Sequence, residues 1–160
     1  MNCDCLTSRF VKENSEKIWE KFSAMNYGDT FILEIKLPEC GCTDENCFDY
    51  GTRRVYDIIK TEMVEVEPYF CENKNEVVEK ERNPGLEFRH RWESWYKDEQ
   101  KWDINLFGEE IVVRLQFNDM KHTIKISHYD NDPFGLDDCN EYHESVFEKE
   151  KDLIEKFILL

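Results

Sequence analysis

Apolar residues recur at the spacing of an α-helix near both ends of the chain. Between residues 8 and 25 they form one stripe, which comprises Val11, Ile18, Phe22 and Met25. Towards the other end a wider stripe follows Asp138 and Glu141, which are spaced as in a capping box. Its members are Val146, Phe147, Leu153, Ile154, Phe157 and Ile158. We therefore predict an amphipathic helix at each end.

Between these helices the pattern changes to alternation and to short β-branched runs, which are typical of strands. Strands are predicted at 30–37, 53–60, 63–67, 86–96 and, in three segments, 102–128. Residues 53–60 also fit a helix through Val55, Ile58 and Ile59, and their alternation favours a strand. The polar residues 97–101 predict a turn.

Two further turns would divide the last of these strand regions. Two-residue loops at Gly108 and Glu109 and at Asn118 and Asp119 would each join two antiparallel strands. They would place Leu106 opposite Ile111, Phe117 opposite Met120 and Leu115 opposite His122. The same apolar face would then recur on successive strands, with His122 as an ordinary histidine of the sheet.

These elements predict an α+β fold, in which an antiparallel β-meander sheet is covered by an N-terminal and a C-terminal amphipathic helix. The chain has 160 residues and a mass of 19.4 kDa, which suits a single domain over residues 1–160. The hydrophobic content of 40% is sufficient for a packed core. The irregular parts are a cysteine-bearing loop at 38–51 and an acidic loop at 129–140.

Two observations bear on localisation. No stretch approaches the roughly 20 consecutive apolar residues of a membrane span. The first five residues lack the basic and apolar regions of a signal peptide. We therefore expect a soluble, intracellular protein of the cytoplasm. Monomer and dimer are equally compatible with the sequence.

Acidic residues outnumber basic ones by 36 to 21, which gives a formal charge of −15. This balance disfavours direct binding to nucleic acid and to anionic membranes. It favours a basic surface of a protein partner, including one that handles nucleic acid. A single alanine beside 14 lysines and 11 asparagines indicates an A+T-rich genome, such as that of a virus or mobile element.

The acidic loop and the start of the last predicted helix contain the densest group of carboxylates. We predict that they bind the partner, with Asp130, Asp132, Asp137, Asp138, Glu141 and Glu144 as candidate contacts. Part of their spacing matches a calcium-binding loop, but Phe134 occupies a ligand position and Pro133 precedes it. A solvated loop with a helix cap explains the same acids, so calcium is not expected.

Five of the seven cysteines form two clusters, which are Cys3 with Cys5 and Cys40 with Cys42 and Cys47. A helix over 8–25 is about 27 Å long and the strand over 30–37 returns about 26 Å, so the clusters can meet. Four of these thiolates would make a closed structural zinc site. The alternative is that they are reduced cysteines in loops.

Aromatic and basic residues alternate over 88–96. Trp92, Trp95, Tyr96 and Trp102 could line a pocket between sheet and helix for a small or nucleotide-like ligand. In the other interpretation this is a half-buried strand, with Arg89 and Arg91 on one face and paired with glutamates.

No catalytic signature is present: there is no nucleophile elbow, P-loop or dinucleotide-binding glycine pattern, and no catalytic residue is assigned. The sequence thus favours a non-enzymatic acidic interaction protein, such as an inhibitor, immunity factor or nucleic-acid mimic. The alternative is a ligand-binding domain or enzyme that uses the aromatic pocket.

Overall fold

The computed structural model describes residues 6–37, 51–66, 81–128 and 139–160. Its elements follow one another as α1 (Leu6–Glu13), α2 (Ser15–Ala24), β1 (Thr30–Lys36), β2 (Thr52–Val66), β3 (Glu81–Tyr96), β4 (Lys101–Asn118), β5 (Thr123–His128) and α3 (Cys139–Ile158). The five strands form one antiparallel sheet in the order β1-β2-β3-β4-β5. The predicted α+β class, with a meander sheet and helices at both ends, is confirmed.

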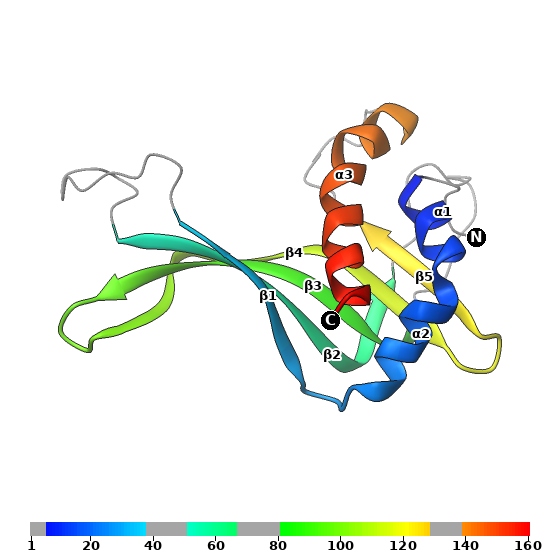
Figure 1. Cartoon of the computed structure of the whole chain (residues 1–160), viewed down its shortest axis with the longest axis horizontal. Helices are drawn as coiled ribbons and strands as arrows, with labels where there is room; N and C mark the ends of the chain where they lie inside the picture. Colours follow the sequence, from blue (N-terminus) through cyan, green and yellow to red (C-terminus); the bar gives the residue numbers. More distant parts are fainter. Residues whose placement is uncertain (1–5, 38–50, 67–80, 129–138) are drawn as a thin grey trace.

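All three helices pack over one half of the sheet, and the other half extends beyond them (Figure 1). The core lies between the helices and the covered part of β2 to β5. Its largest side chains include Phe88, Phe117 and Phe157, which are all fully buried. The first and last helices are joined directly, because the Thr7 hydroxyl donates a buried hydrogen bond of 3.1 Å to Glu150. No described helix is both long and apolar enough to cross a membrane.

The predicted first helix is divided into two. Asn14 separates α1 from α2, and its side-chain amide donates to the carbonyl of Phe10 at 2.9 Å. The predicted apolar stripe is nevertheless correct, since Val11, Ile18, Phe22 and Met25 are all buried. Lys60 of β2 satisfies the end of α2, where its Nζ donates to the carbonyl oxygens of Phe22 and Met25 at 2.7 and 2.8 Å.

The predicted hairpin at Gly108 is wrong. β4 is a single strand from Lys101 to Asn118, and residues 105–108 form an irregularity where four residues oppose only Trp92 of β3. Gly108 has φ 72°, a conformation that suits either a turn or a bulge. Because the strand does not reverse here, Leu106 is fully exposed instead of paired with Ile111.

The next hairpin forms, but its register differs from the prediction. Phe117 pairs with Ile124, not with Met120, so the loop between β4 and β5 has four residues, 119–122. His122 is therefore a turn residue with φ 49°, not a histidine of the sheet. Its ring stacks on Trp19 of α2, with centroids 4.4 Å apart.

Charge is unevenly distributed along the chain. The described ranges contain 23 acidic and 19 basic residues, which accounts for −4 of the total charge of −15. The remaining −11 belongs to segments 1–5, 38–50, 67–80 and 129–138. The described part of the chain is thus far closer to neutral than the composition of the whole chain suggests.

Candidate functional site

The part of the sheet that extends beyond the helices is the most distinctive surface of the molecule. We call it the sheet arm and define it as residues 34–36 of β1, 52–56 of β2, 90–96 of β3 and 101–110 of β4 (Figure 1). Its inner end meets the helices, since Glu34 forms an ion pair of 2.8 Å with Lys156 of α3 and Tyr56 belongs to the core. Large apolar side chains are exposed on it, namely Ile35, Trp95, Tyr96, Ile104, Leu106 and Phe107. Leu37, which directly follows β1, is also exposed.

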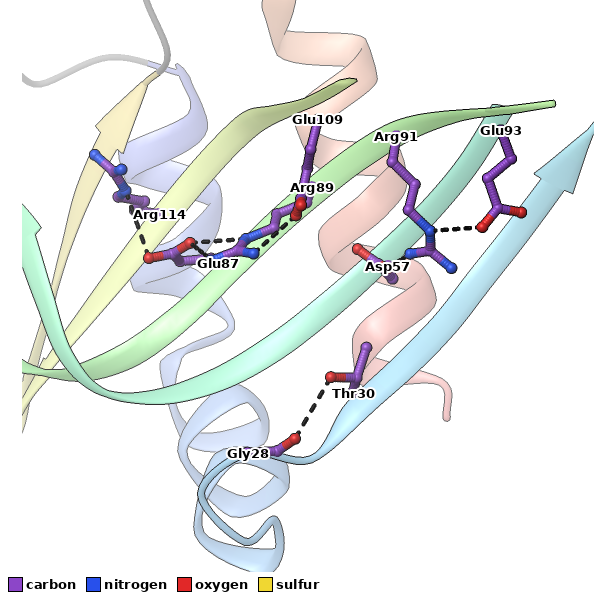
Figure 2. A network of polar contacts seen from close by, with 9 residues as sticks. All are labelled: Gly28, Thr30, Asp57, Glu87, Arg89, Arg91, Glu93, Glu109 and Arg114. Atoms are coloured by element: carbon purple, nitrogen blue, oxygen red, sulfur yellow. Dashed lines mark hydrogen bonds and ion pairs between the residues drawn. The ribbon is translucent and has the colours of Figure 1, made fainter. Parts of the chain in front are cut away.

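The sheet face opposite the helices carries a row of ion pairs (Figure 2). Asp57 of β2 is only 2% exposed and forms an ion pair with Arg91 of β3. Arg91 also contacts Glu93 at 3.1 Å, and Arg53 of β2 contacts Glu93 at 2.7 Å. Asp57 therefore depends on Arg91 alone among these cations, whereas Glu93 contacts both Arg53 and Arg91.

A second group of ion pairs continues the row towards β4 (Figure 2). Arg89 contacts Glu87 on its own strand, and it contacts Glu109 of β4 at 2.8 Å. Arg114 lies 3.8 Å from Glu87 on the other side. Burial lowers the pKa of Arg89, but its hydrogen bonds with Glu87 and Glu109 outweigh this effect and raise the pKa above its usual value. The predicted pairing of Arg89 and Arg91 with glutamates is confirmed.

The opposite face of the arm, on the helix side, contains a histidine among aromatic rings. His90 is buried, and its Nε2 lies 2.7 Å from Glu110 of β4. Its Nδ1 is buried and has no hydrogen-bond partner among the described residues. Burial lowers the pKa of His90, and the contact with Glu110 opposes this only in part. The neutral imidazole is therefore favoured.

The four aromatic residues predicted to line one pocket lie on two faces of the arm. Trp92 is on the same face as His90, where Arg54 covers its ring at 3.8 Å and Phe107 packs against it. Tyr96 shares that face by alternation, and its hydroxyl donates to the carbonyl of Ile104. Trp95 and Trp102 form a cross-strand pair on the other face, with ring centroids 5.6 Å apart, and Arg53 lies 4.3 Å from the Trp102 ring.

The predicted metal and partner residues lie in other parts of the chain. Outside the described residues are Cys3, Cys5, Cys40, Cys42, Cys47, Asp130, Asp132, Asp137 and Asp138. Glu141 and Glu144 belong to α3, but their side chains are not among those described. Within the part of the chain that is described, no three His, Cys, Asp or Glu residues are grouped as metal ligands would be. Zinc binding by the cysteines stays a prediction.

Sequence reasoning missed Asp57, which is the most deeply buried carboxylate of the ion-pair row. The sequence did mark Asp57 as unusual, because Asp is disfavoured within strands and because Val55 and Ile59 flank this position at strand spacing. A charged residue at such a position needs a partner when buried. The ion pairs and aromatic side chains of the sheet arm are suited to the binding of a partner more than to proton transfer.

No protein-family model, curated protein or solved structure matches this chain.

Proposed function

We propose that the protein is a non-catalytic interaction protein, and that the sheet arm binds a basic surface of a protein partner. The observation that carries this proposal is the group of exposed apolar side chains on an arm that extends beyond the helices (Figure 1). Exposed apolar residues that gather in one part of the molecule mark an interaction site, and on the arm they lie on both faces, with Trp95 on the outer face and Tyr96 on the helix side. The arm also presents Trp95, Tyr96 and Arg53, which belong to the residue types that contribute most at protein interfaces.

The ion-pair row supports binding without conformational change. Arg53, Arg91 and Glu93 hold one another across two strands, so their side chains are already ordered before a partner arrives. Ordering long side chains on association costs about 0.5–1.5 kcal/mol for each one. Because these side chains are already ordered in the free protein, the surface binds a partner more tightly than a flexible surface of equal area does.

Charge supports a basic partner. The sequence 38–50, which connects β1 to β2 of the arm, contains four acidic residues and no basic ones. Together with the overall charge of −15, this attracts positive surfaces and raises the association rate at low salt. Proteins that handle nucleic acid present such surfaces, so an inhibitor, immunity factor or nucleic-acid mimic is the form of function that we propose.

The test compares two variants whose altered side chains are equally exposed. Leu106 lies on the arm and Met120 lies in the turn between β4 and β5, and both are essentially fully exposed. Neither Leu106→Ser nor Met120→Ser removes core packing. Affinity capture from the host, followed by mass spectrometry, supplies candidate partners. Titration calorimetry then gives the Kd of each purified candidate for the wild type and both variants at low and moderate salt.

We expect a basic partner whose affinity falls with rising salt. Leu106→Ser should weaken its binding about tenfold, as expected for an interface anchor, and Met120→Ser should leave it unchanged. If both variants bind every partner as tightly as the wild type does, the arm is not the interface. If the affinity does not respond to salt, charge attraction is not part of recognition.

A further inference from the structure

A groove of about 640 Å³ is lined by residues of α1 and β5. These two elements lie at the end of the molecule away from the sheet arm (Figure 1). The lining of the groove comes from residues 8–15 and 121–126, which are far apart in sequence. β5 is an edge strand, and no described strand pairs with its outer side. The volume is within the range of roughly 300–1,000 Å³ that is typical of sites for small ligands.

The groove is cationic although the protein is acidic. Four of its lining residues are basic, namely Arg9, Lys12, Lys121 and Lys125, and none is acidic. Arg9 and Lys125 already make contacts of their own, so the argument depends on the other two. Lys12 and Lys121 are exposed, and neither forms an ion pair with another described residue. Lys12 and Lys121, one from α1 and one from the turn before β5, thus both line the groove.

One wall of the groove is held in place by an aromatic stack. His122 adopts φ 49°, in the left-handed region that is costly for a residue with a side chain. Its ring stacks on Trp19 with an interplanar angle of 14°, which stabilises this turn conformation. The backbone amide of Lys121 donates to the side chain of Asn118 in the same turn. The backbone that carries Lys121 is therefore fixed before any ligand binds.

The remaining lining residues match the two parts of a phosphate ester. Ser15 and Thr123 provide hydroxyl groups, which can donate hydrogen bonds to phosphate oxygens. Ile124 is partly exposed and provides apolar surface against which a planar ring can pack, and Val11 and Ile126 are buried in the core beside it. Charge, hydroxyls and an apolar wall in one groove suit a ligand that is anionic at one end and flat and apolar at the other.

We propose that this groove binds a nucleotide, with its phosphate groups between Lys12 and Lys121. The base then lies against Ile124, which is partly exposed and is backed by the buried side chains of Val11 and Ile126. Lysine ammonium groups bind phosphate as point charges and do not require a planar fork geometry. This site is separate from the sheet arm, so it stands whether or not the arm binds a protein.

The test measures nucleotide binding by titration calorimetry on the full chain. The probes are ATP, ADP, AMP, adenosine and pyrophosphate. The decisive variant is Lys12→Gln/Lys121→Gln. The matched control is Lys36→Gln/Lys101→Gln, which changes the net charge equally but lies on the sheet arm. Circular dichroism melting of both variants checks that the fold is retained, which we expect because all four lysines are exposed.

We expect the affinity to increase in the order AMP, ADP, ATP. ATP should also bind more tightly than adenosine alone or pyrophosphate alone. The groove variant should bind ATP at least tenfold more weakly than the wild type, and the arm variant should bind it as the wild type does. Absence of ATP binding, or equal loss in both variants, would overturn the proposal. Pyrophosphate binding as tight as ATP binding would overturn the assignment of a nucleotide.

Discussion

Replacing Arg91 by methionine tests the ion-pair row of the outer sheet face. Methionine replaces the aliphatic stem of the arginine side chain but lacks the cation that neutralises Asp57. Glu93 is less affected, because Arg53 remains 2.7 Å from it. The side chain of Asp57 is only 3% exposed, so it would be left as a buried and unpaired carboxylate.

The expected loss of stability follows from this burial. Removing one partner of a buried ion pair costs about 3–5 kcal/mol, and partial exposure of Arg91 places the cost near the lower end. For a chain of this size, about 3 kcal/mol lowers Tm by roughly 6–12 °C. Replacing both partners, as in Asp57→Val/Arg91→Met, should recover most of the loss, since apolar residues of similar volume can replace a buried pair without penalty.

Urea denaturation followed by circular dichroism measures these effects, with the thermal midpoint as a second readout. Lys101→Met is the control, because it removes ion pairs with Glu99 and Asp103 at a fully solvated position, and we expect no change in its urea midpoint. A loss below about 1 kcal/mol for Arg91→Met would refute the reasoning. A double variant that is no more stable than Arg91→Met would show that the unpaired carboxylate is not the cause.

Three further predictions concern other parts of the fold. Burial lowers the pKa of His90, so the histidine of the unfolded state is protonated first as the pH falls below about 6.5. The free energy of unfolding should therefore decrease below this pH, by up to about 1.4 kcal/mol per pH unit. Urea titrations across this range should give a smaller slope for His90→Gln than for the wild type or for the control His122→Gln. Gly85→Ala should cost about 3 kcal/mol of unfolding free energy, because its Cβ would lie 2.2 Å from the carbonyl oxygen of Leu115; an unchanged urea midpoint would contradict this. Lys60→Met should cost about 2 kcal/mol in the same assay, since two buried carbonyl groups at the end of α2 lose their donor, and a neutral result would mean that water replaces it.

The alternation of apolar residues predicted the core face of the sheet because burial on one face imposes a period of two. It failed at Gly108, where a positive φ suits a reversal and a bulge equally well and only pairing with β3 decides between them. The register of β5 failed for a similar reason. Asn118 and Asp119 are good turn residues in loops of two or four residues, and the buried partners Phe117 and Ile124 select the longer one.

The candidate sites were harder to predict than the fold. Local alternation indicated that Arg89 and Arg91 share a face, because both lie on one strand. It could not indicate that Asp57 reaches Arg91, since that contact depends on the register between β2 and β3. The cationic groove could not be predicted from the sequence, because Lys12 and Lys121 line the same groove only when α1 packs beside β5.

The hydrogen bond between Thr7 and Glu150 has a consequence for the order of folding. Every strand of the sheet pairs with its neighbour in sequence, so the sheet can assemble by closing connections of at most 15 residues. The contact between α1 and α3 instead spans 143 positions, and its closure costs more chain entropy. We therefore expect the helices at the two ends to meet late in folding. An interaction formed after the transition state governs the rate of unfolding rather than the rate of folding, so we expect this one buried contact to help set the lifetime of the native state.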